Sequence, residues 1–182
     1  IGLEELADLG LGVAGDLVVR ADREVAVVLE AVRLDREADL VAALNLGDSF
    51  RVVADAATYD AMGARVVKAL GKLGPVDTVI LDHPHADMAQ VVALGEKLSD
   101  DRAVVAVGSG TVNDLCKFVT GRQGRKYCVF GTAASMNGYT STTASITLES
   151  GLKVSLPSQA PSGFFVDLKV QADAPRHLSA SG

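Results

Sequence analysis

An apolar run that ends in two closely spaced glycines constrains the fold of this chain more than any other stretch. Residues 104–107 are continuously apolar, as in strands that are covered on both faces of a parallel sheet. Gly108 and Gly110 then permit a tight turn, and a helix is expected to start there and run past Lys117. Because the first amides and the dipole of a helix favour an anion, the stretch predicts a phosphate site. A tight turn without any ligand would use the same glycines.

Strand-like and helix-like patterns alternate along the middle of the chain. Residues 51–54, 76–81 and 127–130 are short, mostly apolar runs that are typical of strands. Residues 59–73 and 86–98 repeat their apolar positions at helical spacing. This alternation predicts a Rossmann-like, doubly wound α/β fold with a parallel sheet and right-handed crossovers.

The remaining patterns predict one more helix and four further strands. Asp35 is expected to cap a helix that continues to Leu44 and stops at Gly47. A β-hairpin is expected at 144–156, with its turn at Glu149-Ser150-Gly151. Single strands are expected at 25–29 and 164–167.

The composition narrows the classes of protein to which the chain can belong. At 182 residues with 48% hydrophobic positions, one domain can bury a core, so 1–182 is expected to form a single domain. A net charge of -6 without a basic cluster argues against a nucleic-acid partner. No run has membrane-spanning length, so we expect no membrane insertion. Cys116 and Cys128 stand among apolar residues, which favours reduced thiols and a cytoplasmic protein.

Candidate ligand-binding residues follow three of the predicted parallel strands. In such sheets, ligands bind beyond the carboxyl ends of the strands, which here are Asp55, the stretch 108–114 and the loop 131–142. Asp55 could accept a hydrogen bond from a ribose 2′-hydroxyl and repel a 2′-phosphate, which favours NAD over NADP. The alternative role for Asp55 is a helix cap or turn. The loop 131–142 is rich in small and hydroxyl residues and could approach a ligand closely, or it could be an ordinary surface loop.

Three other features each allow two interpretations. His83 and His85 could hold a metal, although imidazoles on a proline-containing loop are usually solvated. Cys116 could have a lowered pKa near the helix start or be a packed thiol. Lys117 could face a bound phosphate or point outward into solvent.

Two motifs together make the pattern specific. The chain resembles glycerol-1-phosphate dehydrogenases, in the superfamily of iron-containing alcohol dehydrogenases, glycerol dehydrogenases and dehydroquinate synthases, through Gly108-Ser109-Gly110-Thr111-Val112-Asn113-Asp114 and Thr132-Ala133-Ala134-Ser135-x-Asn137-Gly138-x-x-Ser141. Residues 165–167 and 174–182 resemble that family as well.

The resemblance implies a role for each residue of these motifs. The cofactor would be NAD or NADP, with its adenosine ribose on Asp55 and its pyrophosphate on Gly108, Ser109, Gly110, Thr111, Val112, Asn113 and Asp114. Its nicotinamide half would contact Thr132, Ala133, Ala134, Ser135 and Ser141. Asn137 stands where the family normally has an aspartate that contacts the substrate hydroxyls, so a negative charge is replaced by an amide that can also donate.

The resemblance also implies parts that lie outside this sequence. The family's divalent metal (zinc, nickel or iron) is held by one Asp and two His, all expected beyond Gly182, so no metal ligand is expected within the chain. The chain would be the N-terminal dinucleotide-binding half, with a helical C-terminal domain beginning near 175–182. The half alone is expected to be inactive, and the full-length protein to be a homo-oligomer.

The implied activity is an NAD(P)-dependent, metal-assisted interconversion of dihydroxyacetone phosphate and sn-glycerol 1-phosphate, or of a related small phosphorylated substrate. One alternative is a dehydroquinate synthase-like lyase that uses NAD transiently. The other is a nucleotide-binding module without catalysis, and Asn137 is the reason to keep that alternative.

Overall fold

A seven-stranded sheet forms the centre of the molecule, in the order β1-β2-β9-β6-β5-β3-β4. The computed structural model describes residues 16–21, 25–30 and 36–179. All neighbouring strands from β2 to β4 are parallel, and β1 is added antiparallel at one edge. The strands are β1 (Asp16–Ala21), β2 (Val25–Glu30), β3 (Phe50–Asp55), β4 (Val76–Leu81), β5 (Ala103–Gly108), β6 (Tyr127–Gly131) and β9 (Gly163–Asp167).

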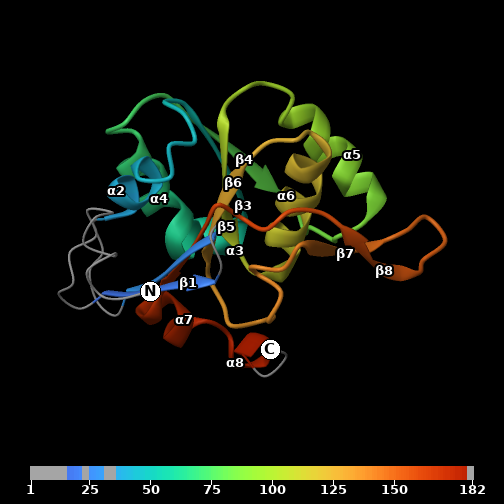
Figure 1. Cartoon of the computed structure of the whole chain (residues 1–182). Helices are drawn as coiled ribbons and strands as arrows, with labels where there is room; N and C mark the ends of the chain where they lie inside the picture. Colours follow the sequence, from blue (N-terminus) through green and yellow to red (C-terminus); the bar gives the residue numbers. More distant parts are fainter. Residues whose placement is uncertain (1–15, 22–24, 31–35, 180–182) are drawn as a thin grey trace.

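Helices cover both faces of this sheet. Figure 1 shows α2 and α4 on one side of the strands and α5 and α6 on the other. Strand residues alternate between two cores: Val104 and Ala106 of β5 pack toward α5 and α6, whereas Val105 and Val107 pack toward α2 and α4. The helices are α2 (Glu37–Ala42), α3 (Ala56–Thr58), α4 (Ala64–Leu70), α5 (Met88–Lys97), α6 (Gly110–Arg122), α7 (Leu168–Asp173) and α8 (Arg176–Ser179).

The predicted parallel sheet and hairpin are confirmed. The strands expected at 25–29, 51–54, 76–81, 104–107, 127–130 and 164–167 are β2, β3, β4, β5, β6 and β9. The hairpin consists of β7 (Thr143–Thr147) and β8 (Lys153–Pro157), which pair antiparallel in a separate two-stranded sheet. Strand β1 was not predicted, because its residues follow a stretch without a clear pattern.

The helix expected at 59–73 begins and ends earlier than its apolar period suggests. It starts at Ala56, because Asp55 Oδ1 accepts from the amide of Thr58 (2.8 Å) and the Thr58 hydroxyl accepts from the amide of Asp55 (3.1 Å). This reciprocal capping box confirms the cap role for Asp55. A π-helical turn, η1 (Tyr59–Gly63), leads into α4, which ends at Leu70.

The helix expected before Gly47 is shorter than predicted. Its proposed cap, Asp35, lies outside the described residues, and α2 ends at Ala42 instead of Leu44. The chain leaves the helix through positive φ at Asn45 (49°) as well as at Gly47 (139°). Asparagine tolerates a positive φ, so the chain can turn away from α2 at Asn45, before it reaches Gly47.

An ion-pair network joins the helices of one face to the end of β9. The guanidinium of Arg65 on α4 lies 2.5 Å from the Glu37 carboxylate on α2 and 2.6 Å from that of Asp167. The other oxygen of Asp167 accepts from the amides of Lys169 (2.9 Å) and Val170 (3.1 Å) and so caps α7. This network therefore fixes the start of α7 relative to the sheet.

Helix α6 packs closely against the sheet at Gly108, the last residue of β5. A Cβ built on Gly108 would lie 2.6 Å from the Cβ of Val112 on α6, so no larger residue fits there. Glycine is thus required at this position because it lets the helix pack directly against the strand end. Among the described residues, no helix has the length and hydropathy needed to cross a membrane.

This contact predicts a strong effect of a single methyl group. Gly108→Ala should lower the free energy of unfolding by about 1–3 kcal/mol, because overpacked cores lose about that much. The matched control is Gly95→Ala on α5, where an added Cβ meets nothing within 4 Å and should be neutral or stabilising by up to about 1 kcal/mol. Urea denaturation of both variants measures the difference, and equal stabilities would contradict the proposed packing constraint.

Candidate functional site

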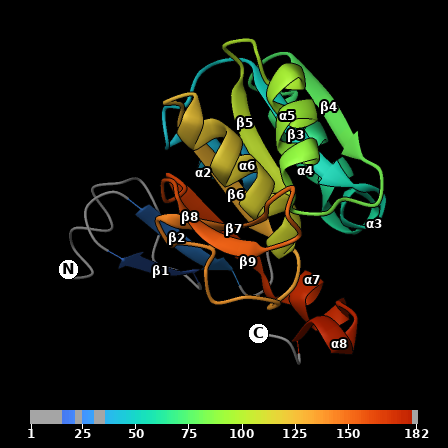
Figure 2. The same ribbon diagram turned by 90° about the vertical axis from the view of Figure 1, so that its right-hand side faces the viewer.

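Two adjoining cavities open over the glycine turn, at the carboxyl ends of the parallel strands. They share Ser109 of the turn and Leu178 of α8. Figure 1 and Figure 2 both place α7 and α8 at this end of the molecule, near the loop that follows β6. The site lies where the sheet order reverses between β3 and β5, which is the expected ligand position in such folds.

The larger cavity, of about 500 Å³, is here called the polar cavity. Its wall is made by the start of α6, the loop after β6 and the hairpin, with Ala86 and Leu178 at its border. Apart from Met136, the other lining side chains are small or carry a hydroxyl, amide or charge: Ser109, Gly110, Thr111, Asp114, Ser135, Asn137, Gly138, Ser141, Thr143, Ser145, Lys153 and Ser155.

The smaller cavity, of about 280 Å³, is here called the apolar cavity. The end of β3 and the helix after it supply Asp55, Ala57, Thr58 and Ala61. The opposite wall comes from the start of the loop after β6 and from the two last helices, with Thr132, Ala133, Val170, Asp173, Ala174, Pro175 and Leu178. Asp55 therefore both caps a helix and borders a cavity, so its two predicted roles are compatible.

The start of α6 presents backbone donors to the polar cavity. The first amide bonded within the helix is that of Asn113, which donates to the carbonyl of Ser109 at 3.1 Å. The amides of Thr111 and Val112 precede it and therefore have no acceptor inside the helix. The amide of Gly110 lies 3.4 Å from Ser135 Oγ, which draws the following loop against the turn. Amides at a helix start, together with the dipole, form a site for an anionic group.

The loop 132–142 is held in place by a buried tyrosine. The Tyr139 hydroxyl donates to the carbonyl of Ala133 at 2.8 Å, and its ring stacks on Phe164 with centroids 4.6 Å apart. Burial raises the pKa of Tyr139 to about 12, so the hydroxyl stays protonated as a donor. The loop thereby closes around Tyr139 and leaves Ser135 and Asn137 at the polar cavity.

Lys117 anchors the same loop from the helix side. Its side chain is fully buried, and its ammonium donates to the carbonyl of Gly138 (2.6 Å), Ser141 Oγ (3.1 Å) and the carbonyl of Thr143 (3.2 Å). The interpretation of Lys117 as a solvated side chain was therefore wrong, whereas the phosphate contact stays a prediction, and Lys117 lines neither cavity. Burial lowers the pKa of Lys117 to about 8, although the charge of Asp114 opposes that shift.

Asp114 is a buried acid at the wall of the polar cavity. It is 7% exposed, and its Oδ1 has no hydrogen-bond partner in the described structure. Burial raises the pKa of Asp114, whereas the charge of Lys117, the backbone amide of Ser145 and the charge of Lys153 oppose the shift. An unpaired buried oxygen beside a cavity is free to contact a ligand donor.

The structure brings together most of the predicted site residues but not all of them. The predicted residues at the two cavities are Asp55, Ser109, Gly110, Thr111, Asp114, Thr132, Ala133, Ser135, Asn137 and Ser141. Gly108, Val112, Asn113 and Ala134 lie outside both linings. The Val112 side chain belongs to the core, and Asn113 Oδ1 accepts from the Tyr127 hydroxyl at 3.0 Å.

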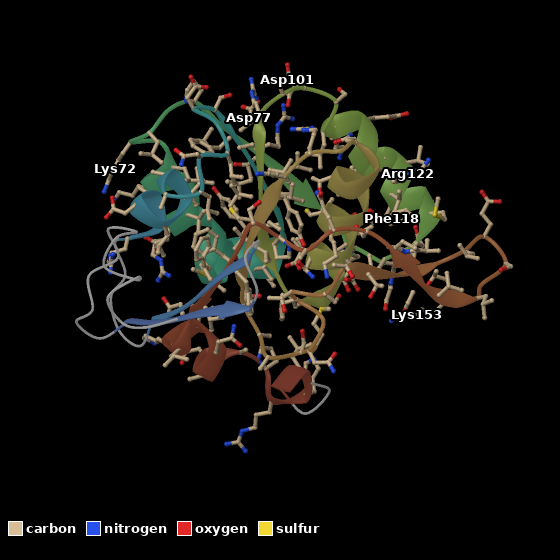
Figure 3. All side chains as sticks on the ribbon, in the orientation of Figure 1. Lys72, Asp77, Asp101, Phe118, Arg122 and Lys153 are labelled. Carbon is tan, nitrogen blue, oxygen red and sulfur yellow. The ribbon has the colours of Figure 1, made fainter. Side chains whose placement is uncertain are left out.

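Sequence reasoning missed the contribution of the hairpin. Thr143 and Ser145 of β7 and Lys153 and Ser155 of β8 line the polar cavity. Figure 3 shows Lys153 on this hairpin. The sequence does contain a signal for a polar face on the hairpin. Hydroxyl residues in β7 alternate with the buried Ala144 and Ile146, so the strand has one polar and one apolar face.

The family follows from comparison with known proteins. The sequence model of the iron-containing alcohol dehydrogenase family matches residues 28–175, which is most of the chain. The chain belongs to the iron-containing alcohol dehydrogenase family. A curated relative, the glycerol-1-phosphate dehydrogenase of Bacillus velezensis, is 30% identical over 138 residues, covering 72% of this chain and 35% of the relative.

Solved structures show the same fold. A crystal structure of an iron-containing alcohol dehydrogenase superposes with a TM-score of 0.74 at 14% identity, over 87% of this chain and 50% of that one. A 2-deoxy-scyllo-inosose synthase, complexed with carbaglucose-6-phosphate, NAD+ and Co2+, gives 0.67 at 20% identity, over 88% and 48%. The Rossmann-like α/β fold is thus confirmed. The chain spans about a third of the length of the curated relatives it matches.

The other candidate groups of this iron-containing alcohol dehydrogenase family member have ordinary surroundings. His83 and His85 are exposed, and the described residues contain no group of three or more His, Cys, Asp or Glu that could hold a metal. Cys116 and Cys128 are free, fully buried thiols, and burial raises the pKa of both. The packed-thiol interpretation of Cys116 is therefore confirmed.

Buried thiols of raised pKa predict a chemical outcome. In the native chain at about pH 8, Cys116 and Cys128 should resist a disulfide reagent such as dithionitrobenzoate, because only an accessible thiolate attacks it. Both should react in concentrated guanidinium chloride, which provides the control. Rapid reaction of either thiol before unfolding would contradict the described packing.

Proposed function

We propose that this chain is the dinucleotide-binding half of an NAD(P)-dependent dehydrogenase that interconverts dihydroxyacetone phosphate and sn-glycerol 1-phosphate. The observation that carries the proposal is the pair of cavities over the glycine turn. The polar cavity has backbone donors and Lys153, and the apolar cavity is bordered by the carboxylate of Asp55. Its support from relatives is the name glycerol-1-phosphate dehydrogenase, which the curated relatives bear at about 30% identity.

The two cavities fit the two ends of a dinucleotide. The amide of Thr111 and the ammonium of Lys153 would hold the pyrophosphate. Asp55 would accept hydrogen bonds from the adenosine ribose in the apolar cavity, which has aliphatic walls suited to a nucleoside. Ser135, Asn137 and Ser141 would then face the nicotinamide and the substrate in the polar cavity. The bound nicotinamide supplies the hydride, and the protein orients it.

The substrate end of the site has the chemistry of a polyol or phosphate site. The hydroxyls of Ser145 and Ser155 suit a small molecule with several oxygens. Asn137 can both donate to and accept from a substrate hydroxyl. We further propose that a divalent metal, zinc, nickel or iron, is held by residues that are not part of this chain.

The proposal is tested with the full-length protein, using dihydroxyacetone phosphate, NADH or NADPH and a panel of divalent metals. Metal-dependent oxidation of the cofactor would support the dehydrogenase. Dinucleotide binding without turnover would contradict it and favour the binding module, with Asn137→Asp as the first variant to assay. Carbocyclic product from a phosphorylated heptulosonate, with no net cofactor oxidation, would favour the dehydroquinate synthase-like lyase.

The position of Asp55 predicts the choice between the two cofactors. Asp55→Asn should raise the use of NADPH relative to NADH about tenfold, because it removes a negative charge beside the 2′-phosphate. Asparagine still caps the helix, so stability should change little. Steady-state assays with both cofactors measure the ratio. The control is Asp60→Asn, an exposed acid on η1, and an unchanged ratio in Asp55→Asn would contradict the ribose assignment.

The position of Lys153 predicts an electrostatic effect on affinity. Lys153→Gln should weaken NADH binding about tenfold, and the loss should shrink as salt is added, because screening weakens the lost charge interaction. Fluorescence titration of NADH at two salt concentrations measures both effects. Lys126→Gln, at an exposed lysine just before β6, is the matched control. Equal affinities of the two variants would remove Lys153 from the proposed phosphate site.

A further inference from the structure

The buried ammonium of Lys117 has no role in the binding scheme above. Its residue is fully buried, and it does not line either cavity. Burying an ammonium is costly unless hydrogen bonds replace its water, and long charged side chains are seldom fully buried without partners. A lysine in such a place therefore calls for a specific structural role.

The three donors of this ammonium meet three acceptors. The carbonyl of Gly138, Ser141 Oγ and the carbonyl of Thr143 lie 2.6, 3.1 and 3.2 Å from Nζ. Since the Ser141 hydroxyl accepts from Lys117, its own proton can go to the carbonyl of Gly138 or Thr143, each 2.9 Å away. The network joins the end of the loop 132–142 and the start of β7 to the second turn of α6.

Helix α6 carries both the backbone amides of the proposed anion site and Lys117, which anchors the loop. The free amides of Thr111 and Val112 lie in the first turn of α6, and Lys117 lies two turns from its start. Because a helix is stiff, the anchor fixes the distance between those amides and the loop residues Asn137 and Ser141 at the polar cavity. The opposite side of the loop is fixed separately by Tyr139, whose hydroxyl bonds to Ala133.

We propose that Lys117 is a positioning residue that locks the loop 132–142 against α6 and so prepares the polar cavity for its ligand. This inference rests on the proposed dinucleotide function for the identity of the ligand, but not for the locking itself. An apolar side chain of similar length would leave two carbonyls and a hydroxyl buried without a donor. The loop would then open, and ligand binding would have to restore its order at the expense of affinity.

The test compares graded variants of Lys117 in the full-length protein. Lys117→Met keeps the length of the side chain and removes every donor, whereas Lys117→Gln restores an uncharged NH₂ group with two donors. Thr120→Val is the matched control, because Thr120 is buried one turn further along α6 and bonds to the carbonyl of Cys116, away from the loop. The two readouts are NADH affinity and chymotrypsin cleavage after Tyr139, located by mass spectrometry.

We expect both readouts to follow the number of donors. Lys117→Met should weaken NADH binding about tenfold or more and expose the bond after Tyr139, and Lys117→Gln should lie between it and the unaltered protein. Thr120→Val should lose stability in denaturant but keep its affinity and loop protection.

Two results would overturn the positioning role. One is a Lys117→Gln protein, or a folded Lys117→Met protein, that matches the unaltered protein in both readouts. The other is Thr120→Val losing affinity and protection as much as Lys117→Met at equal loss of stability. If the unaltered protein does not bind NADH, the proposed function fails, but the cleavage pattern still decides the positioning role.

Discussion

The contact between Gly108 and Val112 is the constraint on which the site depends. Because the strand end carries no side chain, α6 packs directly on β5, and its first turn lies at the rim of the sheet. The same placement puts Asp114 at the wall of the polar cavity and buries Lys117 one turn further. Because Gly108 has no side chain, the position of α6 on the sheet is fixed. This one helix supplies the free backbone amides, the Asp114 carboxyl group and the Lys117 ammonium that anchors the loop.

Much of the fold could be predicted because its signals are local. Buried parallel strands are continuously apolar, and the hairpin shows itself by alternating residues around a turn. The rule that ligands bind at the carboxyl ends of such strands then brought Asp55, Ser109 and Asn137 to one end of the sheet, where the two cavities lie. Helix ends were less accurate, because capping by Asp55 outweighs the apolar period that begins later.

What could not be predicted depends on contacts between distant segments. A lysine on a helix ordinarily faces water, and only the folding of residues 138–143 over α6 buries Lys117. Likewise, the hairpin becomes part of the site because it packs beside the glycine turn. The alternation in β7 marks a polar face, but it does not say which distant segment that face meets. Asn113 fits the glycine motif as a cofactor contact, yet its amide is turned inward to the Tyr127 hydroxyl.

Leu178 borders both cavities, although it lies on the last described helix. That helix follows α7, whose start is tied to the sheet by Asp167 and, through Arg65, to α2. Filling the cavities and docking these helices are therefore linked equilibria, and each must favour the other by the same free energy. A ligand in the cavities would therefore hold α8 in its docked position, so the position of this last described helix would report whether the site is filled.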